Sequence, residues 1–107
     1  MTEQELGGNI RLINFDEMDA QELILAKKII GNYAKKIRNF KEYQELRIEI
    51  KNHSKGKANK FEVNGLLIFD GGNATSNAEG VNPFVLINEV LEKILNEIEH
   101  KSRNKEQ

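Results

Sequence analysis

Apolar residues recur at alternating spacings of three and four in two segments, which is the period of an amphipathic helix. The two stripes are Leu23, Ala26, Ile30, Tyr33, Ile37 and Phe84, Ile87, Leu91, Ile94, Ile98. We therefore expect one helix over residues 19–39 and another from residue 83 to about residue 101. Each helix has one apolar face that must pack against the rest of the chain.

Capping residues mark where both helices begin. Asp16 or Asp19 precedes the first stripe, and a short polar side chain there accepts hydrogen bonds from the first turn. Asn82 has the same position before the second stripe, and Pro83 follows where its missing N–H costs nothing. Gly31 lies inside the first helix, where it costs about 1 kcal/mol relative to alanine. We interpret it as the mark of a close packing contact.

Four other segments alternate apolar and polar residues, the period of a strand with one buried face. They are residues 9–14, 43–52, 60–69 and 74–80. The last has only small residues on its apolar face, so a helix can approach it closely. Asn64-Gly65 and Asp70-Gly71 are both hairpin signals. We place the turn at Asp70, which makes Gly65 a bulge or kink within a strand.

The predicted element order is β-α-β-β-β-α, and the fold class is α+β. Three consecutive antiparallel strands form a meander, and the first strand joins them after a helical crossover. A four-stranded sheet with two helices on one face makes a two-layer sandwich. The other face would carry Arg47, Glu49, Lys51 and Glu62 in solvent. We expect one domain over residues 9–101, a flexible lead-in over 1–8 and a polar tail over 102–107.

The composition is that of a soluble globular domain. The chain has 107 residues, of which 38% are hydrophobic and 31% charged. It has no cysteine, which excludes disulfides, thiolate zinc sites and thiol catalysis. No apolar run approaches the roughly 20 residues that span a bilayer, and the first residues are acidic, unlike a signal peptide. We expect a cytoplasmic protein without membrane contact.

Signals for catalysis are weak. His53 is predicted in a turn and His100 near a helix end, and neither has the spacing of a catalytic relay or a metal site. Asp16, Glu17 and Asp19 are explained as acids at a helix start. The run 70–73 precedes a strand and not a helix N-terminus, so it is not a phosphate loop. We expect no enzyme, no metal and no cofactor.

Charge is concentrated in the middle of the chain. Residues 1–26 hold six acids and one base, residues 27–60 eleven bases and three acids, and residues 61–107 eight acids and four bases. A local excess of positive charge attracts polyanions. The candidate phosphate contacts are Lys27, Lys28, Lys35, Lys36 and Arg38 on the first helix and Lys51, Lys55, Lys57 and Lys60 around one hairpin. Helix and hairpin would line a groove for phosphates. The alternative is an ordinary solvated surface.

Three places in the chain together resemble a known family. They are the strand and helix over 10–40, the run Phe61-Glu62-Val63-Asn64-Gly65, and Ala78-Glu79-Gly80 followed by Pro83-Phe84-Val85-Leu86-Ile87-Asn88, Leu91, Lys93 and Ile94. From residue 9 to residue 101 the layout resembles the ribosome hibernation-promoting factors, also called ribosome-associated translation inhibitors. The resemblance implies a fold akin to a double-stranded-RNA-binding domain, located in the decoding region of the small ribosomal subunit.

The same resemblance implies rRNA contacts from both helices. The second helix supplies Lys93 and Lys101, but it departs from the family because its acids outnumber its bases. We therefore expect a short, single-domain form that binds small-subunit rRNA and regulates translation by occupancy, with no DNA partner. The alternative is a protein-interaction or homodimerising module that has lost RNA binding. Its partner surface would be the acidic second helix or an exposed sheet edge.

Overall fold

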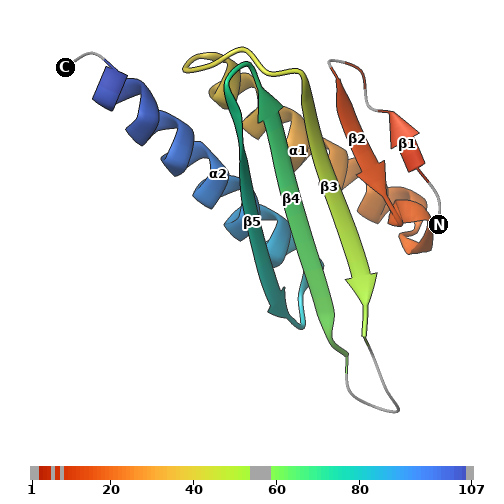
Figure 1. The fold of residues 1–107 in the computed structure, drawn as a ribbon. Coiled ribbons are helices and arrows are strands. Elements are labelled where there is room, and N and C mark those ends of the chain that lie inside the picture. The colour runs from red at the N-terminus through yellow and green to blue at the C-terminus, as the bar shows by residue number, and fades with distance from the viewer. Residues whose placement is uncertain (1–2, 6, 8, 54–58, 106–107) are drawn as a thin grey trace.

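The computed structural model describes residues 3–5, 7, 9–53 and 59–105. It contains one mixed sheet and two α-helices, and both helices lie behind the same face of the sheet (Figure 1). In chain order the elements are β1 (Glu3–Glu5), β2 (Ile10–Ile13), the 3-10 helix η1 (Phe15–Glu17), α1 (Ala20–Arg38), β3 (Glu45–Asn52), β4 (Phe61–Phe69), β5 (Gly72–Gly80) and α2 (Pro83–Lys105). The predicted α+β sandwich is confirmed.

The strands lie in the order β1-β2-β3-β4-β5. β3, β4 and β5 form the predicted antiparallel meander, and β2 joins β3 in parallel after the α1 crossover. The turn between β4 and β5 is at Asp70-Gly71, as expected, with Phe69 paired to Gly72. Gly71 has a φ of 93°, a conformation that favours glycine.

Both ends of the described chain are more ordered than the sequence indicates. Residues 3–5 form β1, which pairs antiparallel with β2 and adds a fifth strand inside the expected lead-in. α2 continues to Lys105, within the expected polar tail. Neither extension has an apolar pattern. Strand pairing by backbone groups explains β1, and the absence of glycine and proline after Pro83 explains the longer helix.

The predicted caps are present. The side chain of Asp19 accepts a hydrogen bond from the Glu22 N–H (2.8 Å), and the Glu22 side chain accepts one from the Asp19 N–H (3.1 Å). This reciprocal pair is a capping box. Asn82 Oδ1 accepts from the Phe84 N–H at 3.0 Å. Asp16 lies in η1 and is not the cap of α1.

The core lies between the sheet and the two helices. The helical stripes are buried in it, except Leu23, Tyr33 and Phe84, which pack partly buried against it. α2 buries a wider face than predicted, because Val90 and Leu95 are also in the core. On β5 the small residues Ala74 and Ala78 are buried, so α2 can lie directly against this strand.

The two glycines that we singled out have roles opposite to those expected. Gly65 is not a bulge, since β4 keeps an unbroken register with both neighbours. A Cβ there would lie 2.5 Å from Val90 Cγ1 and 2.9 Å from Ile94 Cδ1, so Gly65 lets α2 approach the sheet. Gly31 marks no close contact, because a Cβ there would meet nothing within 4 Å.

Candidate nucleic-acid interface

The exposed side of α1 carries the densest group of predicted phosphate contacts. Lys28, Lys35, Lys36 and Arg38 are exposed, and Lys27 is half-buried. The apolar stripe of α1 packs against the core, so these basic residues on the other side of the helix face solvent. Within the described part of the chain, Lys27, Lys28 and Lys35 form no ion pair. These three ammonium groups are therefore available to an anion.

Aromatic side chains hold two other cations of α1. Lys36 Nζ lies 5.0 Å from the centre of the Tyr33 ring, and the guanidinium carbon of Arg38 lies 5.2 Å from that of Tyr43. Lys36 and Arg38 also lie in the last turn of α1, where positive charge stabilises the helix C-terminus. These two residues thus have a structural role beside any role in binding.

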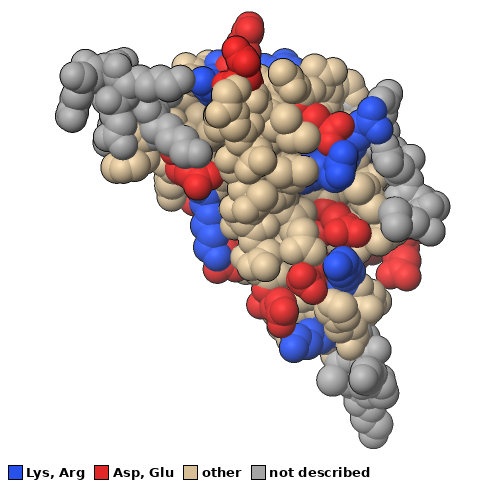
Figure 2. Space-filling view, in the orientation of Figure 1, with Lys and Arg blue, Asp and Glu red and all other residues tan. Residues whose placement is uncertain are grey.

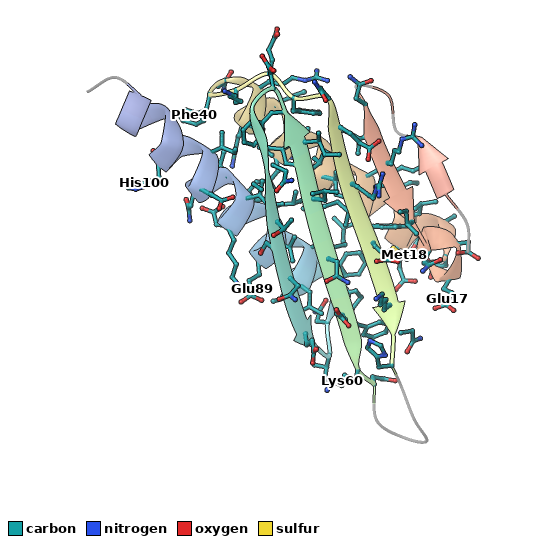
Figure 3. All side chains as sticks on the ribbon, viewed as in Figure 1. Glu17, Met18, Phe40, Lys60, Glu89 and His100 are labelled. Carbon is teal, nitrogen blue, oxygen red and sulfur yellow. The ribbon has the colours of Figure 1, made fainter. Side chains whose placement is uncertain are left out.

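Of the remaining predicted contacts, those that the structure describes do not line a groove with α1. Lys51 lies on the sheet face opposite the helices, because the alternating residues Leu46, Ile48 and Ile50 face the core. Lys60 pairs with Glu79 at 3.3 Å at one end of the sheet (Figure 3). Lys93 lies on α2. Lys101 is in the last turns of α2, and Lys55 and Lys57 are outside the described residues.

The helical layer is divided between the basic helix α1 and an acidic stretch of α2, residues 89–99, which holds four acids and one lysine. Glu89, Glu92 and Glu97 are exposed on α2, which lies beside α1. A hydrogen bond from Tyr33 Oη to Glu92 Oε2 (2.8 Å) connects the two helices. Burial, and then the hydrogen bond and charge of Glu92, raise the pKa of Tyr33. A polyanion is therefore attracted to one half of this layer and repelled by the other.

Replacing Tyr33 by phenylalanine removes this link, and we expect Tyr33→Phe to lower the free energy of unfolding by about 1 kcal/mol at pH 7. The raised pKa adds a pH dependence. The native state holds the phenol proton more tightly than the unfolded chain, so the wild type loses this stabilisation as the pH rises above about 10. Urea unfolding at pH 7 and pH 10.5 measures the difference between the two proteins. A gap that stays constant between the two pH values would contradict the prediction.

The opposite face of the sheet carries both signs of charge. Figure 2 shows Lys and Arg side chains interspersed with Asp and Glu across it. Glu45 accepts ion pairs from Arg11 (2.9 Å) and Arg47 (2.6 Å). A shallow hollow lies between Arg47, Glu49, Asn64 and Thr75. Among the described residues this face has no excess of cations that would attract phosphates, and the sequence analysis correctly placed polar residues here.

The histidine that we considered for catalysis has an ordinary surface partner. His53 Nε2 lies 2.9 Å from Glu62 Oε1. This hydrogen bond, followed by one from Asn64, lowers the pKa of the Glu62 carboxyl. Among the described residues no group of three or more metal-ligating side chains is present. The pair therefore acts as a cross-strand contact at the end of β3 and β4.

Exposed apolar side chains are a feature that sequence reasoning missed. Ile24 is 67% exposed and Leu25 46% exposed in the first turns of α1, and Val85 is 59% exposed near the start of α2. Ile24 precedes Lys28 by one helical turn, so the exposed side of α1 is apolar at its start and basic at its end. The sequence did hold a signal for this exposure, because Ile24 lies outside the apolar stripe of the first helix.

The described fold belongs to the class of two-layer α+β sandwiches in which two helices cover one face of a mixed sheet. No family model matches the chain, and no curated protein matches it. Among solved structures it is similar to the crystal structure of the Thermus thermophilus Protein Y N-terminal domain. That match has a TM-score of 0.50 and 15% sequence identity, and covers 85% of this chain and 91% of that chain. The similarity shows a shared fold.

In the part of the chain that the structure describes, neither helix is both long and apolar enough to cross a membrane.

Proposed function

We propose that this protein binds small-subunit rRNA without catalysis and regulates translation by occupying a site on the ribosome. The observation that carries the proposal is the group of exposed lysines on α1 that form no ion pair among the described residues. The fold supports it, because the sandwich implied by the resemblance to the hibernation-promoting factors is the fold found, and the Protein Y N-terminal domain shares it.

Phosphates would contact the last three turns of α1. Lys28 and Lys35 lie seven residues apart, so they follow each other along one side of the helix over about 10 Å. The acidic side of α2 repels the RNA backbone and directs it to the far side of α1. Contacts of this kind position a protein on RNA but do not read its sequence. Recognition would rest on the shape of the folded RNA.

Sedimentation with purified small ribosomal subunits over a salt series tests the proposal. About five phosphate contacts predict a slope of log affinity against log salt of about −3.5 to −4.5. Free protein in the supernatant at low salt, or binding that does not change with salt, would overturn it. The same titration with a double-stranded RNA of unrelated sequence separates general RNA affinity from a preference for the ribosomal subunit.

A second candidate function is that of a protein-interaction module on the same fold. The acidic surface of α2 and the exposed apolar residues at the start of α1 favour it. Such a module would show no affinity for RNA at any salt concentration. Its oligomeric state, measured by sedimentation equilibrium, would then decide between self-association and a different partner.

A further inference from the structure

The free edge of β5 has backbone groups that no strand pairs. β5 is the last strand of the sheet, at the side opposite β1, so one side of its backbone faces away from β4 (Figure 1). The strand is nine residues long, and its register with β4 is unbroken along its whole length. A long, regular edge is the kind to which another extended chain can add.

The pattern of hydrogen bonds identifies the groups that point outward. Hydrogen-bonded pairs alternate with non-bonded pairs in an antiparallel ladder. The His53 N–H donates to the Lys60 carbonyl at 2.8 Å. The backbone N–H and C=O groups of even-numbered residues in β4 therefore point to β3, and those of odd-numbered residues point to β5. Because odd-numbered residues of β4 pair with even-numbered residues of β5, the backbone groups of odd-numbered residues in β5 point away from the sheet. The outward groups belong to Asn73, Thr75, Asn77 and Glu79.

A lysine from α2 confirms this direction and partly covers the edge. Lys93 Nζ donates to the Asn77 carbonyl at 3.4 Å and lies 3.8 Å from Glu89 Oε1. In the described part of the chain, the outward backbone groups of Asn73 and Thr75 have no partner. Lysine is a common means of protecting a sheet edge. Here it covers one acceptor in the second half of the strand and leaves the first half open.

The charges around this edge determine which chain fits it. Among the described residues they belong to Glu62, Asp70, Glu79, Glu89, Glu97, Lys41, Lys60 and Lys93. Figure 3 shows Glu89 on the β5 side of the molecule and Lys60 at the end of the sheet where β4 begins. Among these described residues carboxylates outnumber ammonium groups by five to three, so a second copy of this chain would bring the same acidic excess and be repelled. A basic chain is complementary.

We propose that the free edge of β5 binds an extended, lysine- or arginine-rich segment of another protein as an additional strand. The segment exchanges hydrogen bonds with Thr75 and Asn77, and Lys93 leaves the Asn77 carbonyl to admit it. Its positive side chains then reach Glu79 and Glu89. The outward surface of α1 takes no part, so this site does not depend on RNA binding.

A peptide titration followed by NMR tests the proposal directly. The probe is a blocked nonapeptide of alternating threonine and lysine, added to the full-length protein up to about 1 mM, a concentration that detects weak binding. We expect shifts of the amide signals of Asn73, Thr75, Asn77 and Glu79, and slower hydrogen exchange at these positions. Two control peptides should give no such shifts. One has glutamate in place of lysine, and the other keeps the charge but has every amide N-methylated.

Matched variants locate the binding edge. Thr75→Pro removes an outward N–H without touching the ladder to β4, whereas Thr75→Ala keeps it. We expect at least tenfold weaker peptide binding for the proline variant and less than a twofold change for the alanine variant. Lys93→Ala should tighten binding about threefold to tenfold, because the peptide no longer competes for the Asn77 carbonyl.

Three results would overturn the proposal. They are an equal response to the N-methylated peptide, shifts confined to α1, and edge shifts that depend on protein concentration without peptide. The last would assign the edge to a second copy of the chain. If Thr75→Pro fails to fold, the N-methylated control and the Lys93→Ala comparison still decide the question on folded protein.

Discussion

Gly65→Ala is expected to destabilise the protein by about 1–3 kcal/mol, although alanine is the smallest addition to a glycine. The new Cβ would lie 2.5 Å from Val90 Cγ1 and 2.9 Å from Ile94 Cδ1, so α2 must shift or valine must leave its preferred rotamer. For a domain of this size the loss corresponds to a fall in melting temperature of roughly 4–8 °C per kcal/mol. Thermal and urea unfolding, followed by circular dichroism, measure it.

A double-mutant cycle shows whether the loss of stability comes from this clash or from a general intolerance of β4 to substitution. Val90→Ala removes the γ carbons, so the Gly65→Ala cost should largely disappear in the Val90→Ala background. Gly31→Ala is the matched control in a helix. Its Cβ meets nothing within 4 Å, and we expect it to stabilise the protein by about 1 kcal/mol. Independent, additive effects of Gly65→Ala and Val90→Ala would show that the contact is not the cause.

These two glycines show where sequence reasoning stops. Helices, strands and caps follow from local pattern and local hydrogen bonding, which is why Asp19, Asn82 and the two stripes were predicted correctly. A glycine's role depends on what packs against it, and at Gly65 that is Val90 and Ile94, more than twenty residues later in the chain. β1 was missed for a related reason. Its pairing uses backbone groups, and its sequence has no apolar alternation.

The candidate site divides in the same way. Exposed cations on α1 follow from helical periodicity, and the structure places them as expected. The proposed groove required knowledge of which face each strand residue takes. Lys51 shares its alternation with Arg47 and Glu49, so it lies on the face opposite the helices. Lys60 contacts Glu79 and Lys93 contacts the Asn77 carbonyl, both on β5, and only the tertiary arrangement makes these two contacts.

Reversing the charge of three lysines on α1 is expected to abolish binding to the small ribosomal subunit. At about 0.1 M salt each phosphate contact contributes roughly 0.7–0.9 units of log affinity. Changing Lys28, Lys35 and Lys36 together to glutamate removes three contacts, so affinity should fall by at least about a hundredfold. The salt slope should become shallower by about 2–3. Sedimentation with subunits across the same salt series measures both quantities.

The matched control reverses three other lysines and changes the net charge by the same amount. Lys51, Lys60 and Lys93 lie away from the exposed side of α1, and the last two are in surface ion pairs that contribute little to stability. Their joint change to glutamate should reduce binding by less than about threefold at physiological salt, where charges more than a Debye length away are screened.

Equal losses in the two triple variants would mean that net charge alone, and not a site on α1, governs binding. Because negative charge at the end of α1 also weakens the helix, the thermal melt of each variant must accompany the binding data. A version with glutamine at Lys28, Lys35 and Lys36 removes the contacts without adding repulsion, and should retain the shallower salt slope. If a folded glutamate variant binds as tightly as the wild type, the α1 lysines do not contact RNA and are an ordinary solvated surface. The fold would then serve a protein partner through its acidic side.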